Sequence, residues 1–201
     1  ITAHSFKLLP TPSSIQTGLS ARVGRLNPAW NEASGPSDEN ERFKVLCCVN
    51  VAAPPHALAG SHVADIVRVW LPARSIVVEA LDAAASVHPS GMVLQLSRFC
   101  PWKQHLFQLE EERGIVGRVL YVLYQDARGA WRIQCVPEHA NSFTNRKSMP
   151  AEWRGLRDEA LSKVLGVDGA IFVHAGGFIG GHTTLEGVLH MADASVASAE
   201  S

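Results

Sequence analysis

The strongest candidate for chemistry in this sequence is the stretch FVHAGGFIGGHTTLEG at residues 172–187. An apolar run of strand length enters four glycines, and a helix is then expected to begin with Thr183 and Glu186 at capping-box spacing. Glycines let the backbone approach a ligand closely, and the N–H groups of a helix start favour an anion such as phosphate. The pattern predicts a phosphate-binding strand–loop–helix at Gly180, Gly181, His182 and Thr183. The alternative is a glycine-rich turn that only packs a strand against a helix.

Three further residues are candidates for the same phosphate site. Arg154 and Arg157 are three residues apart on a helix predicted over 151–166, so they would share a face that could meet phosphates. The alternative is ordinary salt bridging to nearby carboxylates: Glu152, Asp158 and Glu159. His174 ends a predicted strand and is interpreted first as a satisfied core histidine. Its alternative role is to line the pocket beside His182.

No residue of this chain is predicted to be catalytic or to bind a metal. The sequence has no Asp-His-His run, no H-E-x-x-H, no nucleophile elbow and no Walker loop. Trp102, with Lys103 and His105 beside it, could stack on a base, but a tryptophan at helical spacing is more typical of a core. Aromatic residues make up 7% of the chain, and no stacking platform is evident.

The composition indicates a folded domain rather than a disordered chain. The 201 residues are 46% hydrophobic and carry a formal net charge of -1, so any affinity for nucleic acid must come from a local basic face. The four cysteines lack metal-ligand spacing, which favours a reducing compartment. No apolar run is long enough to span a membrane. Because the chain begins at Ile1 rather than Met, a preceding segment is expected.

The predicted elements alternate between helices and strands. The helices are expected at 72–85, 101–113, 151–166 and 184–194, and the strands at 92–97, 118–126, 130–137 and 169–175. The turn at 126–129, Asp-Ala-Arg-Gly, predicts a hairpin between the second and third strands. This order favours an α/β (α+β) fold, with a mixed β-sheet flanked by helices.

Three segments are predicted along the chain. Residues 1–42 are rich in Pro, Ser, Gly and Asn and form a linker or the end of a preceding domain. Residues 43–69 lack steady periodicity and contain Pro54-Pro55, and residues 70–201 form a C-terminal domain that carries the predicted phosphate site. The helix over 151–166 is expected to bury Trp153, Leu156, Ala160 and Val164.

Six blocks of the sequence resemble the Myg-type exonuclease family, in the family's order. They are LSARVGRLNPAWN (19–31), WLPARSIVVEAL (70–81), CPWKQHLFQLE (100–110), WRIQCVP (131–137), WRGLRDEAL (153–161) and IFVHAGGFIGGHTTLEGVLHMA (171–192). More distantly, the chain resembles the DHH phosphoesterase superfamily, whose C-terminal domain uses a Gly-Gly-His loop to hold substrate phosphate. Residues 45–69 depart from the family pattern, and the loop has Ala-Gly-Gly where Ala-Ser-Gly is common.

The resemblance implies that the parent protein is a metal-dependent 3′–5′ RNA exonuclease of mitochondria, nucleus or cytoplasm. Its metal ions, Mn or Mg, are expected in a missing N-terminal DHH-like domain, so this chain would bind no cofactor itself. The expected partners are RNA and that N-terminal domain, with no membrane. The resemblance assigns the phosphate grip to Gly180, Gly181, His182 and Thr183, and matches Arg154 and Arg157 to the WRGLRDE block. A non-catalytic RNA-binding or scaffold subunit of a ribonucleoprotein, such as a mitochondrial ribosome, is the alternative.

Overall fold

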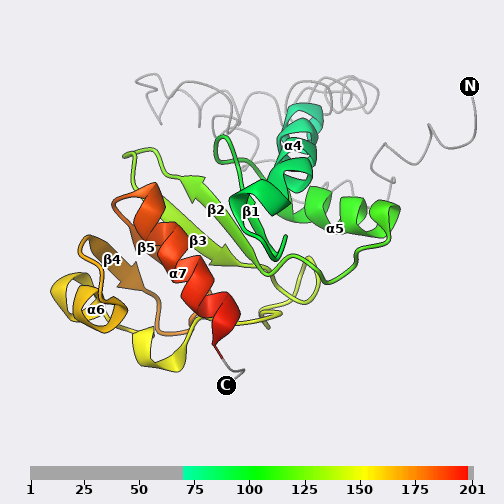
Figure 1. Ribbon diagram of the computed structural model, residues 1–201. Helices are drawn as coiled ribbons and strands as arrows, with labels where there is room; N and C mark the ends of the chain where they lie inside the picture. Colours follow the sequence, from blue (N-terminus) through cyan, green and yellow to red (C-terminus); the bar gives the residue numbers. More distant parts are fainter. Residues whose placement is uncertain (1–69, 199–201) are drawn as a thin grey trace, which may run out of the picture. The chain divides into compact units, whose positions relative to one another are not determined.

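The computed structural model describes residues 70–198, which form helices around a five-stranded sheet (Figure 1). The predicted segments 1–42 and 43–69 lie outside the described residues. The helices are α4 (Leu71–Val87), α5 (Trp102–Arg113), α6 (Asp158–Leu165) and α7 (Leu185–Ala197), with a short 3-10 helix, η4 (Ala151–Trp153). The strands are β1 (Val93–Gln95), β2 (Tyr121–Gln125), β3 (Trp131–Cys135), β4 (Ala170–Val173) and β5 (Ile179–His182).

The sheet has the strand order β1-β2-β3-β5-β4 and is mixed. Strands β1 and β2 run parallel, whereas β2 with β3, β3 with β5, and β5 with β4 run antiparallel. The predicted fold class, a mixed sheet flanked by helices, is therefore confirmed. The predicted hairpin at 126–129 is also present: Asp126 Oδ1 accepts hydrogen bonds from the N–H groups of Arg128 and Ala130, and Gly129 has φ +84°.

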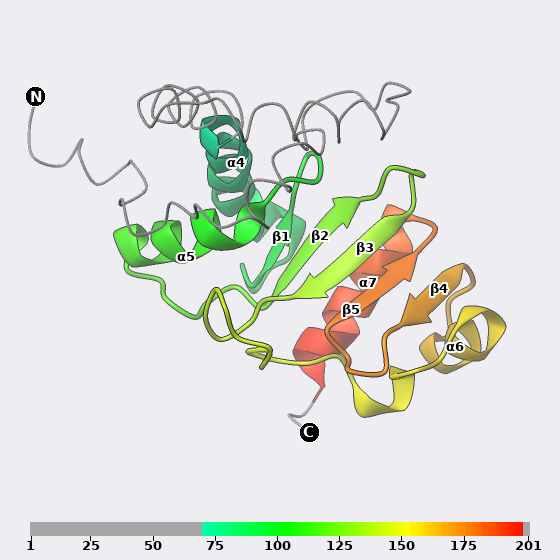
Figure 2. The same ribbon diagram turned by 180° about the vertical axis from the view of Figure 1, so that it is seen from behind.

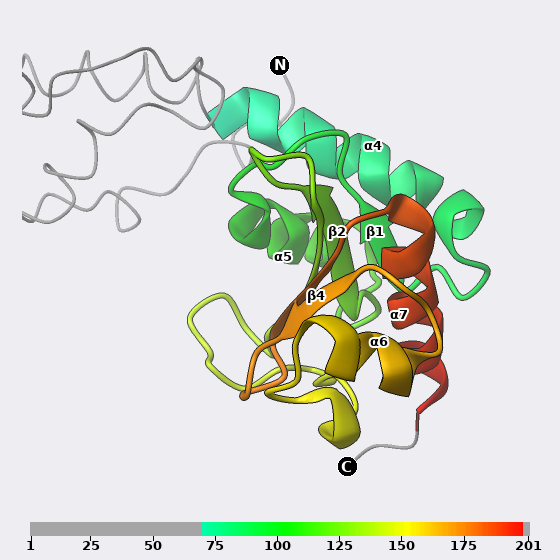
Figure 3. The same ribbon diagram turned by 90° about the vertical axis from the view of Figure 1, so that its left-hand side faces the viewer.

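The helices cover the two faces of the sheet unequally. Helix α7 crosses one face, and its buried side chains Val188, Met191 and Ala192 pack with Leu161 and Leu165 of α6 in the same core cluster (Figure 1). Helix α5 lies on the other side of the sheet, at the β1–β2 end (Figure 3). Seen from that side, β3, β5 and β4 have no helix of residues 70–198 in front of them (Figure 2). We call this surface the open face.

Helix α5 forms as its sequence predicts. Trp102, Leu106 and Leu109 recur at helical spacing and are buried, and Gly114 ends the helix in the left-handed conformation with φ +67°. Trp102 is 2% exposed, so it belongs to the core and is not available to stack on a base.

The long helix predicted over 151–166 is wrong, because the chain is extended in its middle. Arg154 ends η4 with extended backbone, and Gly155 follows with φ +81°. Arg157 forms a bridge with Phe172 of β4 before α6 begins. The interruption shifts the helical phase, so the buried residues of α6 are Leu161 and Leu165. Ala160 and Val164, which were expected in the core, are exposed.

A buried ion pair fixes the connection that follows β3. Glu110 of α5 is 0% exposed and accepts hydrogen bonds from both terminal nitrogens of Arg146, at 2.7 and 2.6 Å. The N–H of Val119 donates to the same carboxylate, and Arg146 also donates to the Val119 carbonyl. Because every charge here is compensated, the pair ties the residue 146 region to α5.

Candidate functional site

The Gly180–Gly181–His182 segment is the strand β5 and not a loop. Gly180 and Gly181 pair with Ile133 and Arg132 of β3 on one side. On the other side they pair with β4. The predicted strand–loop–helix is therefore wrong at this point: β4 and β5 form a hairpin, and the true turn lies at His174–Phe178. Periodicity missed β5 because two of its four residues are glycines with no side chain to show alternation.

The two glycines of β5 face opposite sides of the sheet. A Cβ on Gly180 would lie 3.1 Å from Met191 Cε and 3.1 Å from the Phe172 carbonyl oxygen, on the face covered by α7. A Cβ on Gly181 would collide with the terminal nitrogen Nη1 of Arg132, on the open face. Each glycine therefore leaves room for a specific neighbour, which supports the packing interpretation of this motif.

His182 is buried against the start of α7. It is 1% exposed, and a Cβ on Gly187 would overlap its ring, so the imidazole lies directly on that glycine. Its Nδ1 accepts a hydrogen bond of 3.1 Å from the N–H of Thr184, which places the proton on Nε2. Burial lowers the pKa of His182, while backbone interactions with Asp168 and Thr184 oppose the change. The neutral ring therefore packs between β5 and the start of α7.

Helix α7 begins one residue later than the capping-box spacing predicts. Thr184 is the N-cap, and its hydroxyl accepts from the N–H of Gly187 at 3.1 Å. Thr183 is exposed, and its N–H donates to the Gly169 carbonyl. Of the predicted Gly180–Thr183 site, only Thr183 has an exposed side chain.

His174 is exposed at the β4–β5 turn, so its interpretation as a core histidine is wrong. The apolar strand ends at Val173, and the chain leaves the sheet there. The His174 Nδ1 accepts a hydrogen bond from the N–H of Gly176 at 3.0 Å, and its ring packs on Phe178 with centroids 4.6 Å apart. The Nε2 side of the ring is free to contact a ligand at this turn.

Arg154 lies beside the same turn. Its Nε donates to the Met149 carbonyl at 2.9 Å, and its side chain passes across Gly177, which has φ +65°. Both features direct the guanidinium into a cavity of about 390 Å³ that Lys147 and Gly176 also line. Within residues 70–198, the two terminal nitrogens of Arg154 have no hydrogen-bond partner. The cavity therefore presents a positioned cation that can receive an anion.

Arg157 lies elsewhere, on the open face. Its guanidinium carbon is 5.8 Å from the ring centroid of Phe172, and Arg132 approaches the same ring to 5.3 Å. The predicted shared face of Arg154 and Arg157 is therefore wrong, because the extended residues between η4 and α6 carry the two side chains apart. Arg154 and His174 both lie at the turn end of the β4–β5 hairpin, and Thr183 lies at the other end.

Comparison with known proteins identifies the family. The MYG1 exonuclease family model, described as Uncharacterised protein family (UPF0160), matches residues 5–196. This chain belongs to that family. It is 46% identical to human MYG1 exonuclease over 186 residues, which are 92% of this chain and 47% of the relative. It is 43% identical to the MYG1 protein of Dictyostelium discoideum over 180 residues, which are 88% of this chain and 52% of the relative. No solved structure matches.

The chain spans about half the length of the curated MYG1 relatives that it matches. The residues described here hold no group of three or more His, Cys, Asp or Glu side chains that could bind a metal. The metal ions that the family resemblance implies therefore do not fit this part of the chain, and no step through a metal follows from these residues. No helix among residues 70–198 is both long and apolar enough to cross a membrane.

Sequence reasoning missed three residues that shape the site. Lys147 lines the Arg154 cavity and donates to the carbonyls of Val196 and Ser198 at the end of α7. Gly187 seats the His182 ring, and Arg132 occupies the space above Gly181. The alternation of β3, in which Arg132 and Gln134 flank the buried Ile133, was a visible signal for Arg132. The other two depend on contacts across the fold.

Proposed function

We propose that this chain is the C-terminal substrate-binding part of a metal-dependent 3′–5′ RNA exonuclease of the MYG1 type, and that it holds the RNA phosphate backbone at the β4–β5 hairpin. The observation that carries this proposal is Arg154, whose terminal nitrogens have no partner within residues 70–198 and line a cavity with Lys147. A guanidinium fixed at Nε presents its remaining donors as a fork, which suits the oxygens of a phosphate.

The seven proposed site residues divide into two roles. Arg154, Arg157, His174 and Thr183 would contact phosphate directly, because their side chains reach the surface or a cavity. Gly180, Gly181 and His182 are buried, so their role in the grip is to hold the hairpin and the start of α7 in place. In this proposal the glycine-histidine motif supports the phosphate site without contacting the phosphate.

Hydrolysis itself is assigned to the rest of the parent protein. The relatives named MYG1 exonuclease are about twice as long as the matched segment, and residues 70–198 hold no metal-ligand cluster. Mn or Mg bound in the preceding DHH-like domain would supply activation of water, and this chain would keep the scissile phosphate in position.

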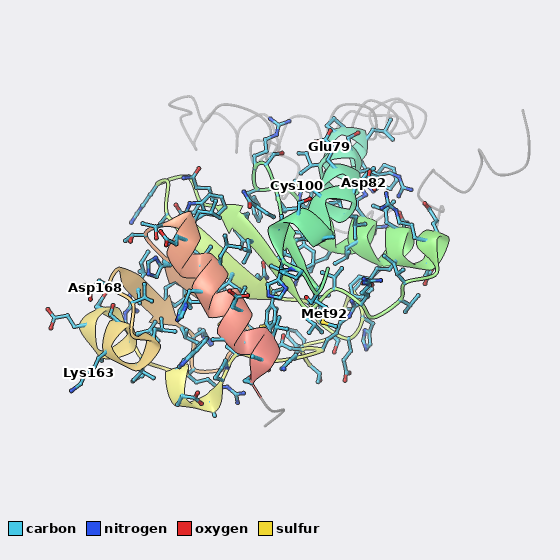
Figure 4. The ribbon with its side chains drawn as sticks, in the orientation of Figure 1. Glu79, Asp82, Met92, Cys100, Lys163 and Asp168 are labelled. Carbon is cyan, nitrogen blue, oxygen red and sulfur yellow. The ribbon has the colours of Figure 1, made fainter. Side chains whose placement is uncertain are left out.

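Binding of a fluorescein-labelled single-stranded RNA to the 201-residue chain, measured by anisotropy across salt concentrations, tests the proposal. We expect Arg154→Ala to weaken binding about tenfold and to reduce the salt slope by about one, since one phosphate contact is lost. Lys163→Ala is the matched control, because Lys163 is an exposed cation at the outer edge of α6 (Figure 4). An Arg154 variant with unchanged affinity, or a wild-type chain that binds no RNA, would contradict the proposal.

A further inference from the structure

Five residues directly opposite one another form a row across the sheet. Tyr124 of β2 pairs with Arg132 of β3, and Arg132 pairs with Gly181 of β5. Gly181 pairs with Phe172 of β4, and Phe172 bridges to Arg157. Paired residues on adjacent strands point to the same face, so the whole row lies on the open face. From Arg132 to Arg157 there are three strand spacings, or roughly 14 Å.

The row alternates aromatic rings with guanidinium groups. Phe172 is flanked by Arg132 and Arg157, whose guanidinium carbons lie 5.3 and 5.8 Å from its ring centroid. The missing side chain at Gly181 leaves space for the Arg132 guanidinium beside β5, and Asp126 pairs with that group at 2.5 Å. The Phe172 ring thus attracts both guanidinium groups, and the ion pair with Asp126 further restrains that of Arg132.

An exposed aromatic ring extends the row beyond Tyr124. Phe99 packs on the Tyr124 ring, with centroids 5.0 Å apart, and remains 47% exposed. Tyr124 is itself nearly buried, and its hydroxyl donates to the Gln134 side chain at 3.1 Å. Phe99 therefore rests on a buried ring and presents an aromatic face outward, where a flat partner can cover it.

We propose that this row is a binding surface for single-stranded RNA, in which Phe99 stacks on a base and Arg157 contacts the backbone. The inference rests on the proposed function, since it names how the bases of the same substrate are held. Open sheet faces with aromatic side chains and arginine planes bind unpaired bases by stacking, at about 1–3 kcal/mol per base. Arg157 has no ion-pair partner within residues 70–198 and supplies the positive charge that a phosphate chain requires.

The test separates base stacking from phosphate binding. The intact 201-residue chain is titrated with a single-stranded oligoadenylate and with an abasic ribose-phosphate oligomer of the same length. We expect Phe99→Ala to weaken oligoadenylate binding about tenfold, leave abasic binding unchanged and keep the salt slope. Arg157→Gln should weaken both ligands and reduce the salt slope by about one. Both side chains are exposed, and circular dichroism verifies that the variants fold.

Each other outcome has a definite meaning. If Arg154→Ala weakens RNA binding but Phe99→Ala and Arg157→Gln do not, the stacking surface and the phosphate contact of Arg157 are overturned, and the hairpin site at Arg154 stands. If the wild-type chain binds neither oligomer, the proposed function is contradicted, and the stacking surface with it. If the Phe99 and Arg157 variants instead weaken association with the separately produced N-terminal half of a MYG1 relative, and leave RNA binding intact, the open face is a protein interface.

Discussion

The two glycines at the centre of β5 are neighbours in the sequence, but they serve two faces of the sheet with different properties. Gly180 faces α7, where Met191, Val173 and the backbone of Phe172 crowd around it. Gly181 faces the open side, where its neighbour is the end of the flexible Arg132 side chain. The first glycine fits a close-packed core, and the second leaves room for the end of a long side chain. Two adjacent residues of one type therefore meet different surroundings on the two faces of the sheet.

The largest expected effect is a loss of unfolding free energy at low pH, caused by the buried histidine His105. Burial lowers the pKa of His105 from 6.5 to about 4, with the nearby Arg74 acting in the same direction. A neutral histidine is thus favoured in the folded state, so the stabilisation is complete above pH 6.5 and is lost as the pH falls toward 4. The lowering of the His105 pKa from 6.5 to about 4 corresponds to roughly 3 kcal/mol of unfolding free energy. Urea denaturation at a series of pH values measures it.

The His105→Leu variant is the control for that titration. It carries no group at this position that must be protonated, so its unfolding free energy should change less between pH 6.5 and 4 than that of the wild type. Burial also lowers the pKa of His182, and this variant leaves that contribution unchanged. Parallel pH profiles for the wild type and His105→Leu would show that His105 does not contribute.

Gly187, on which the His182 ring packs, should tolerate no added methyl group. Gly187→Ala places a Cβ within the His182 ring, so the imidazole must leave its position and lose its hydrogen bond with Thr184. We expect a loss of about 2 kcal/mol of unfolding free energy, measured by urea denaturation.

A double-mutant cycle tests the cause of that loss. In the His182→Ala background the ring is absent, and Gly187→Ala should then be nearly neutral or stabilising, because alanine is the better helix former. If Gly187→Ala costs the same in both backgrounds, the contact between Gly187 and the ring is not responsible.

The smallest effect, and the most direct comparison of the two faces, comes from adding the same methyl group to each glycine of β5. Gly180→Ala meets three neighbours at 3.1 Å, one of them a backbone carbonyl, and should cost about 1–2 kcal/mol. Gly181→Ala displaces the end of the long Arg132 side chain and should cost less than about 1 kcal/mol. Thermal unfolding ranks the two variants. The opposite ranking would mean that the open face is packed as tightly as the core.

Much of the fold could be predicted from the sequence. Trp102, Leu106 and Leu109 recur at helical spacing, and Gly114 ends the helix as a glycine at that place should. The turn residues Asp126 and Gly129 predicted the β2–β3 hairpin because their preferences act within a few residues. Where the signal was not local, prediction failed: Gly155 interrupts the helix expected over 151–166, and β5 shows no alternation.

The sequence by itself determined the family, the helices α4, α5 and α7, and the β2–β3 hairpin, since the order of its motifs and the preferences of single residues are enough for these. Only the tertiary structure decided what the glycine-histidine motif does. Its backbone bonds are made within the sheet, its histidine is covered by α7, and its second glycine opens a place for Arg132. The pairing of β5 with β3 joins residues that are about fifty positions apart, where no spacing rule applies and only the pairing of strands sets the contacts.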